Sequence, residues 1–244
     1  VGVNHIDLAA AASHGITVSN TPGVLTDATA DLTLTLMLML CRRAGEGERE
    51  LRAGEWSGWR PTHLVGRQMT GKTLGIIGMG RIGRAVAHRA HFGFGMEIVF
   101  QNRSPVDDGA CVGGRQLASV AEVCAASEFV SLHCAATPET RHILGRDALA
   151  AMSPSAYVIN TARGDVVDED ALVAALESGG IGGAGLDVFQ GEPRVSPAIM
   201  AAPNTVLLPH LGSATEETRV AMGMKVVENA RAFAMGEALP DKVG

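Results

Sequence analysis

The sequence predicts an α/β fold in which helices cover both faces of a doubly wound parallel sheet. Short apolar runs alternate along the chain with helical segments, which is the pattern of βαβ units. Hydrophobic residues make up 46% of the 244 residues, aromatic residues only 4%, and there are 30 glycines, a composition typical of buried parallel strands between tight turns. A glycine-rich run at residues 78–83 directly follows one of the apolar stretches.

The first segments of the chain precede the sheet. A short helix is predicted at residues 8–13, with Gly15 as its stop, and a short strand at residues 16–18. The chain begins at Val1 without a methionine and in the middle of a motif, so we expect a further N-terminal segment to be missing.

A long helix is predicted next, over residues 26–43, after a turn at residues 21–23. Its apolar residues extend around more than one face, which indicates burial against another element or another subunit. A polar stretch that contains both tryptophans, residues 45–70, then leads to the sheet. One face of the helix carries Leu32, Leu36, Met39 and Leu40.

The remaining segments supply the sheet and its helices. Strands are expected at residues 73–77, 97–100, 129–132, 156–159, 184–188 and 205–208. Helices are expected around residues 119–126, 146–152, 168–178 and 215–235. The last helix is amphipathic, and Ser213 and Glu216 are predicted to form its capping box.

Charge and cysteine usage exclude several classes of protein. The net charge is −6 with no basic block, which argues against a nucleic-acid partner. The most apolar stretch, residues 32–41, is too short to span a bilayer, so no membrane role is expected. There is no C-x-x-C pair and no histidine at metal-ligand spacing, so we expect reduced thiols, a cytoplasmic protein and no metal site. The cysteines are Cys41, Cys111, Cys124 and Cys134.

The glycine-rich run has the pattern G-x-G-x-x-G, formed by Gly78, Gly80 and Gly83, with Arg81 and Ile82 between the last two glycines. An apolar strand precedes it and small residues at helical spacing follow it, which is the context of a dinucleotide fingerprint. The first glycine permits a tight turn, the second lets the backbone approach a pyrophosphate, and the third lets helix and strand pack closely. The helix N-terminus then faces the negative charge. The sequence therefore predicts a Rossmann-type dinucleotide-binding domain.

The end of the second strand of this domain predicts which dinucleotide is bound. In the NAD version of the fold an acidic residue ends that strand and accepts the ribose 2′-hydroxyl. Here the strand ends with Asn102, Arg103 and Ser104, so the acid is absent and a guanidinium can bind a 2′-phosphate, with two neutral donors beside it. We expect NADP, and NAD remains the alternative if Arg103 is only a solvated loop residue.

Three polar residues follow successive strands at the edge where this fold places its chemistry. They are Arg163, Glu192 and His210. Each alone has a plain explanation, as a surface ion pair, a loop carboxylate or a helix-capping histidine. Together, after a dinucleotide fingerprint, they predict one catalytic site.

The sequence resembles the D-isomer-specific 2-hydroxyacid dehydrogenases over essentially its whole length. Four segments carry the resemblance in this order: residues 75–83, 160–164, 185–189 and 209–215. Within the family it is similar to the glyoxylate/hydroxypyruvate reductases and glycerate dehydrogenases, at residues 21–26, 59–61 and 102–104. The resemblance implies an oxidoreductase that reduces glyoxylate or hydroxypyruvate to the D-2-hydroxy acid by hydride transfer from NADPH or NADH.

The resemblance also implies a role for each predicted catalytic residue. Arg163 would bind the keto-acid carboxylate and polarise the carbonyl oxygen. His210 would be the general acid that protonates this oxygen as hydride arrives, and Glu192 would hold the imidazole and favour its charged form. By the same resemblance, Val1 and Gly2 match a carboxylate-binding loop.

Further cofactor contacts follow from the resemblance. Asp187 would accept a hydrogen bond from the nicotinamide carboxamide and select the face of the ring, and Thr29 would lie near the nicotinamide. Backbone groups around Cys134, Thr161 and Gly212 complete this set.

The resemblance implies two domains and a dimer. Residues 23–213 would form the dinucleotide-binding domain, and residues 1–22 with 214–244 a truncated flavodoxin-like substrate domain. A homodimer would be built on the cofactor domain through the long helix and its polar successor. His63 falls near a position where some glyoxylate reductases place an aromatic residue that reaches a neighbouring active site, or else it is a surface residue.

Two alternatives stay open on the sequence alone. One is another D-2-hydroxyacid dehydrogenase, acting on glycerate, phosphoglycerate or lactate, although no extra basic group for a phosphorylated substrate is evident. The other is a dinucleotide-sensing module that has lost catalysis, against which the presence of all three catalytic positions counts.

Overall fold

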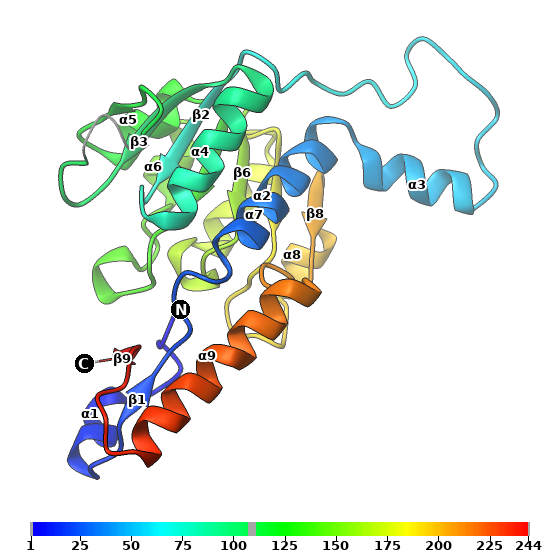
Figure 1. Ribbon diagram of the computed structural model, residues 1–244. Coiled ribbons are helices and arrows are strands. Elements are labelled where there is room, and N and C mark those ends of the chain that lie inside the picture. Colours follow the sequence, from blue (N-terminus) through cyan, green and yellow to red (C-terminus); the bar gives the residue numbers. More distant parts are fainter. Residues whose placement is uncertain (1, 107–110, 244) are drawn as a thin grey trace.

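The computed structural model of the protein describes residues 2–106 and 111–243. Within these residues, seven strands form one parallel sheet in the order β4-β3-β2-β5-β6-β7-β8 (Figure 1). This confirms the predicted doubly wound sheet. The strands are β2 (Thr73–Ile77), β3 (Glu97–Gln101), β4 (Arg115–Gln116), β5 (Phe129–Leu132), β6 (Tyr157–Asn160), β7 (Gly183–Leu186) and β8 (Thr205–Leu207).

The direction in which strands are added to the sheet reverses at β2. This strand pairs with β3 on one side and with β5 on the other, although β5 follows β3 in the chain. In a doubly wound sheet, ligands bind outside the carboxyl ends of the strands at such a reversal. The loops that leave β2 and β5 therefore mark the expected cofactor crevice.

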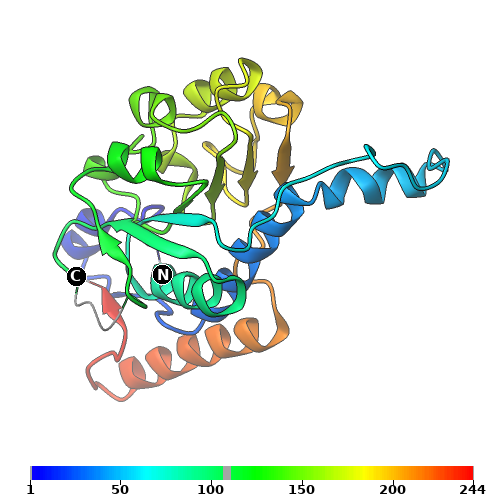
Figure 2. The ribbon, with the colours of Figure 1, turned by 90° about the horizontal axis from the view of Figure 1, so that it is seen from above.

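Two layers of helices cover the two faces of the sheet (Figure 2). They are α2 (Thr26–Cys41) and α4 (Arg81–Phe94) on one face, and α5 (Val120–Ala126), α6 (Arg146–Ala150), α7 (Glu169–Glu177) and α8 (Pro197–Ala201) on the other. Neighbouring strand residues divide between the two cores, because successive side chains of a strand point to opposite faces. Ile76 and Ile159 pack with α2 and α4, whereas Ile77 and Val158 pack with α5, α6 and α7.

Helix α2 is buried on more than one side within the chain, which accounts for its broad apolar coverage. Leu36 and Met37 are fully buried, and the helix packs against α4 as well as against β6 and β7. Arg89 of α4 binds Asp27 and Asp31 of α2, at 2.8 and 2.7 Å. The sheet domain is therefore held together partly by this helix pair.

A helix that the sequence pattern did not predict, α3 (Ala44–Arg52), lies in the polar stretch after α2. It buries no residue and, with the segment that follows it, extends away from the sheet (Figure 2). We call residues 44–66 the arm. Trp56 and Trp59 of the arm are exposed, Trp59 by 83%. The sequence of α3 gives no periodic signal, because five charged residues and two glycines leave it without an apolar stripe.

The two ends of the chain lie together beside the sheet domain (Figure 1). Here β1 (Val18–Ser19) pairs antiparallel with β9 (Lys242–Val243), next to α1 (Leu8–Ser13) and α9 (Glu216–Ala234). Asp241, which precedes β9, accepts hydrogen bonds from Lys225 at 3.2 Å and from Asn229 at 2.9 Å, both on α9. We call α1, β1, α9 and β9 the terminal lobe.

Several predicted boundaries need correction. The capping box of Ser213 and Glu216 is wrong, because α9 begins later and the hydroxyl of Thr215 caps it by accepting the N–H of Thr218 at 3.2 Å. The strand expected at residues 16–18 forms at Val18–Ser19. Elements of two to five residues, β4, α8 and β9, are too short to produce a recognisable pattern.

None of the helices in the described residues combines the length and the apolar content that a membrane crossing requires.

Candidate active site

The three glycines after β2 differ in what surrounds them. Gly78 has a φ of +96°, and a Cβ atom there would lie 2.6 Å from the backbone nitrogen of Cys134. A Cβ atom on Gly83 would overlap the carbonyl oxygen of Gly78, whereas one on Gly80 would meet nothing within 4 Å. The first and third glycines therefore permit close packing within the protein, and the second leaves open space at the crevice.

Helix α4 begins at this open space. Gly80 is its N-cap residue, and among the described residues no side chain caps the helix. The first N–H groups of any helix lack intrahelical partners, and here no capping side chain accepts them. Arg81 is exposed and Ile82 is half-buried. Open N–H groups at a helix N-terminus attract a phosphate, so the residues present fit the pyrophosphate of a dinucleotide.

Asn102, a predicted cofactor residue just after β3, forms its hydrogen bonds with other residues of the protein. The side-chain oxygen of Asn102 accepts the N–H of Met79 at 3.1 Å, and its amide nitrogen donates to the Ser104 carbonyl at 2.9 Å. Asn102 thus ties the glycine run to the turn after β3. Arg103 and Ser104 are exposed, which leaves both available to a ligand.

Two residues at the end of β5 face the glycine run. The backbone of Cys134 lies against Gly78, and burial raises the pKa of its thiol to about 11. His133 contacts the hydroxyl of Ser131 through Nε2 at 2.8 Å, and burial lowers the pKa of its imidazole to about 3. Both side chains are therefore neutral near pH 7, and the loop contributes backbone rather than charge to the crevice.

The structure brings Glu192 and His210 into direct contact. Nδ1 of His210 lies 2.7 Å from Oε2 of Glu192, and Oε1 of the same carboxylate accepts the N–H of Phe189 at 2.9 Å. His210 has a φ of +56°, in the left-handed region that non-glycine residues rarely adopt, and such strain is concentrated at functional sites. With Nδ1 directed at the carboxylate, Nε2 is left to meet a substrate.

Asp187 anchors the loop that carries His210. Its side chain is 1% exposed, and its two carboxylate oxygens accept the N–H groups of Leu211 and Gly212 at 2.7 and 2.8 Å. Burial raises the pKa of this carboxyl, and the two N–H groups partly offset the shift. The Gly212 carbonyl in turn accepts the hydroxyl of Thr29 at 3.0 Å. The structure therefore brings together three predicted cofactor residues, Thr29, Asp187 and Gly212.

Thr161 is linked to the same group through α2. Its hydroxyl lies 3.0 Å from the hydroxyl of Thr33, which also donates to the Thr29 carbonyl at 2.8 Å. All three threonines are buried. Thr33 was not predicted as a site residue, and its one sequence signal is a position one turn after Thr29 on a helix that carries four threonines.

Arg163 connects the sheet domain to the N-terminal segment. Its Nε donates to Oδ1 of Asn4 at 3.1 Å, and a Cβ atom on Gly2 would overlap its guanidinium. Asn160 shapes the turn after β6 by accepting the Ala162 N–H at 3.0 Å and donating to the Arg163 carbonyl at 2.8 Å. Gly2 and Arg163 are thus neighbours, as predicted, while Val1 lies outside the described residues.

Gly164 locks the loops after β6 and β7 against each other. A Cβ atom there would overlap the carbonyl group of Phe189, so the two backbones are in direct contact. This contact joins the loop that carries Arg163 to the loop that carries Glu192. Its only sequence signal was a glycine beside a candidate catalytic residue.

His63 is not part of the site within one chain. It lies on the arm, where Nε2 is 3.0 Å from the carboxylate of Glu50 and Nδ1 is 2.8 Å from Arg60. Figure 1 shows the arm on the opposite side of the sheet domain from the terminal lobe. Within one chain its contacts are therefore those of a surface residue.

Known proteins share the sequence and fold of this chain. The family model for the NAD binding domain of the D-isomer specific 2-hydroxyacid dehydrogenases matches residues 34–212. A glyoxylate reductase of Thermococcus litoralis is 46% identical over 100% of this chain and 74% of its own length.

Solved structures agree. A glyoxylate reductase from Paecilomyes thermophila has a TM-score of 0.90 at 43% identity, over 100% of this chain and 73% of its own. An NADPH-dependent glyoxylate/hydroxypyruvate reductase from Sinorhizobium meliloti, in complex with NADP and malonate, has a TM-score of 0.92 at 38% identity, over 100% of this chain and 75% of its own. The predicted resemblance is confirmed: this chain belongs to the D-isomer-specific 2-hydroxyacid dehydrogenase family, and is a dehydrogenase that uses NAD or NADP.

Proposed function

We propose that this chain reduces a small 2-keto acid, glyoxylate or hydroxypyruvate, to the 2-hydroxy acid. The observation that carries the proposal is the 2.7 Å contact between His210 and Glu192 at the carboxyl edge of a dinucleotide-binding sheet. The names of the similar proteins, glyoxylate reductase and glyoxylate/hydroxypyruvate reductase, support this substrate class.

His210 is the general acid in this proposal. Its protonated imidazole holds Glu192 through Nδ1 and donates the Nε2 proton to the carbonyl oxygen as that oxygen becomes an alkoxide. The contact with Glu192 fixes the orientation of the ring, so that Nε2 faces the substrate. A bound nicotinamide dinucleotide supplies the hydride that C2 of the keto acid receives. A positioned acid of this kind contributes typically about 10²–10⁴ in rate.

Arg163 binds the substrate carboxylate, together with the backbone at Gly2 and Val1. The fork of donors on a guanidinium suits a carboxylate, and the closeness of Gly2 to this guanidinium supports a shared binding place. Within the chain Nε donates to Asn4 and Nη1 donates to the Ala162 carbonyl at 2.6 Å, so Nη2 is the donor left for the ligand.

Two groups of residues would hold the dinucleotide. Thr29, Thr161, Asp187, Gly212 and the Cys134 backbone would surround the nicotinamide, and residues 78–83 the pyrophosphate. The hydrogen bonds among Thr29, Asp187 and Gly212 support this grouping, because they keep the lining fixed before the cofactor binds.

The preferred dinucleotide in this proposal is NADPH. Arg103 is exposed at the end of β3, where an acidic residue would repel a 2′-phosphate, and no acid stands at residues 101–104. The related enzyme from Sinorhizobium meliloti is NADPH-dependent. The charge of Arg103 also acts on one carboxylate, that of Glu139. The Thr137 hydroxyl and, more weakly, the Arg103 charge hold the pKa of Glu139 below its usual range.

The proposal includes two domains, a homodimer and a cytoplasmic setting. The pairing of β1 with β9 supports treating residues 1–22 and 214–244 as one domain and residues 23–213 as the other. The exposed Trp56 and Trp59 support a dimer through the arm, because large apolar side chains gathered on a projecting segment mark an interface. Cys41, Cys124 and Cys134, which form no disulfide bond, support a reducing compartment.

Steady-state kinetics test the proposal. We expect oxidation of NADPH with glyoxylate or hydroxypyruvate, at a higher kcat/KM than with a phosphorylated or larger keto acid. Binding of the dinucleotide without reduction of any small keto acid would contradict the proposal, and would favour the dinucleotide-sensing alternative.

A further inference from the structure

Two carboxylates hold the backbone of the loop that presents Glu192 to His210. The N–H of Phe189 donates to Glu192 itself at 2.9 Å, and the N–H of Gln190 donates to Oε1 of Glu169 at 2.6 Å. The first bond lies within the loop. The second fixes the loop to the start of α7, twenty-one residues earlier in the chain.

Glu169 is buried where a helix normally presents its acidic residues to solvent. It is the first residue of α7, after the N-cap Asp168, yet only 8% of it is exposed. A buried carboxylate is unfavourable unless it is hydrogen-bonded. Burial raises the pKa of this carboxyl, the Gln190 N–H lowers it in part, and the nearby carboxylates of Asp170, Asp165 and Glu192 raise it further. Its bond to Gln190 is therefore the interaction that compensates for burial.

The side chain of Gln190 fixes the same loop a second time. Its Nε2 donates to the carbonyl oxygen of Val167 at 2.6 Å and lies 3.0 Å from Nε2 of His142. Both ends of Gln190, backbone and side chain, are thus held by residues that flank the start of α7. From there the loop leads to Glu192, whose carboxylate meets His210.

We infer that Glu169 is a positioning residue for the catalytic pair, and that its hydrogen bond to the Gln190 N–H keeps Glu192 in contact with His210. The inference rests on the proposed function, because it assigns the pair to proton transfer. Without Glu169 the loop loses its anchor on α7, and Glu192 moves away from Nδ1.

Three variants separate positioning from stability. Glu169→Ala removes the acceptor, and Glu169→Gln retains an oxygen that accepts the Gln190 N–H. Gln has the same shape as Glu and carries no charge, so it avoids the burial cost that raises the pKa of Glu169. Glu177→Ala removes an exposed carboxylate from the other end of the same helix and is the matched control.

The kinetic result expected is a split between kcat and KM. Glu169→Ala lowers kcat for glyoxylate about tenfold, a part of what a general acid contributes, and leaves KM for NADPH unchanged. Glu169→Gln restores most of kcat, and Glu177→Ala matches the wild type. A loss of kcat in Glu169→Gln as large as in Glu169→Ala would overturn the inference, and so would a KM for NADPH that rises in step.

A spectroscopic measurement decides the inference without turnover. An imidazole N–H donated to a carboxylate gives a far-downfield proton resonance at low temperature, assigned here by its loss in His210→Gln. We expect it in the wild type, Glu169→Gln and Glu177→Ala, and not in Glu169→Ala. Its presence in Glu169→Ala would overturn the inference, and its absence from the wild type would do the same. A wild type that shows the resonance but reduces no keto acid refutes the proposed function alone.

Discussion

Gly164 lies directly against the carbonyl group of Phe189, so closely that a Cβ atom would overlap it. Through this contact the turn after β6, which carries Arg163, and the loop after β7, which leads to Glu192, form one unit. The guanidinium of Arg163 and the carboxylate of Glu192 therefore owe their relative position to the contact at Gly164.

Gly164→Ala is expected to lower both stability and activity. Forcing a methyl group into this contact moves the two loops apart, at a cost typical of overpacking, about 1–3 kcal/mol. Urea unfolding and kcat/KM for glyoxylate measure the two effects. The matched control is Gly93→Ala, at an exposed helix position where a Cβ meets nothing within 4 Å, and it should stabilise the protein by about 0.5–1 kcal/mol. If Gly164→Ala and Gly93→Ala had the same free energy of unfolding and the same kcat/KM, the close contact between Gly164 and Phe189 would be refuted.

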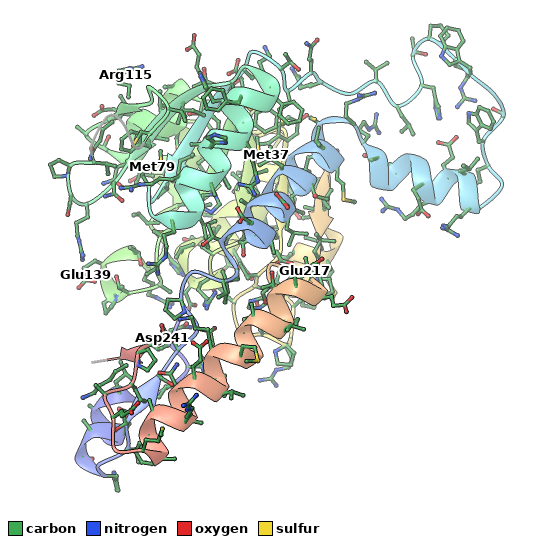
Figure 3. The ribbon with its side chains drawn as sticks, viewed as in Figure 1. Met37, Met79, Arg115, Glu139, Glu217 and Asp241 are labelled. Carbon is green, nitrogen blue, oxygen red and sulfur yellow. The ribbon has the colours of Figure 1, made fainter. Side chains whose placement is uncertain are left out.

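Arg103→Ala is expected to weaken the binding of NADPH much more than the binding of NADH. Loss of a charge-assisted hydrogen bond to the 2′-phosphate costs about 1.5–3 kcal/mol, or roughly 10–100-fold in KM for NADPH. Arg115→Ala is the control, because Arg115 (Figure 3) is an exposed arginine of the edge strand β4 that pairs with Val99, before the end of β3. If the two cofactors lose affinity equally in Arg103→Ala, the assigned preference is wrong.

Cys134 is expected to resist alkylation near neutral pH. The thiolate is the reactive form, and a pKa raised to about 11 by burial keeps the thiol protonated until the pH approaches that value. The rate of iodoacetamide labelling of the Cys134 peptide, followed by mass spectrometry, should rise about tenfold per pH unit between pH 7 and 9 without levelling off. Rapid labelling at pH 7 with a plateau below pH 9 would contradict this environment.

The arm is expected to form the dimer interface. Replacing both exposed tryptophans, Trp56→Ser with Trp59→Ser, removes its largest apolar side chains, and these dominate interface energies. Light scattering after size-exclusion chromatography should show a dimer for the wild type and a shift to monomer for the variant. Phe92→Ser, which removes an exposed aromatic residue from α4 outside the arm, serves as the comparison. A monomeric wild type would refute the proposed dimer.

The sequence sufficed to predict the sheet apart from its edge strand β4, and the helices that cover it apart from α8, while family resemblance predicted that Glu192 holds His210. Buried parallel strands leave strong periodic patterns, and the carboxyl ends of neighbouring strands meet at one edge, so residues that follow them become neighbours. Family resemblance assigned Thr29, Asp187 and Gly212 to the nicotinamide, and the structure joins the three by hydrogen bonds.

Other features of the site arise where residues from different segments of the chain come into contact in the folded protein. In the sequence, Glu169 looks like an ordinary acidic residue of a first helical turn, and nothing local indicates that it is buried against Gln190. Asn102 was expected to donate to the cofactor, but its two polar ends are used to hold Met79 and Ser104. The arm was missed because a helix made of charged residues and glycines has no apolar face to detect.

The most direct measurement is a comparison of turnover and cofactor binding in His210→Gln. If the imidazole is the general acid, kcat for glyoxylate reduction falls by about 10²–10⁴ while the Kd for NADPH, measured by fluorescence titration, stays close to the wild-type value. A variant that keeps its turnover, or that loses NADPH binding together with turnover, would contradict the role assigned to His210 and its partner Glu192.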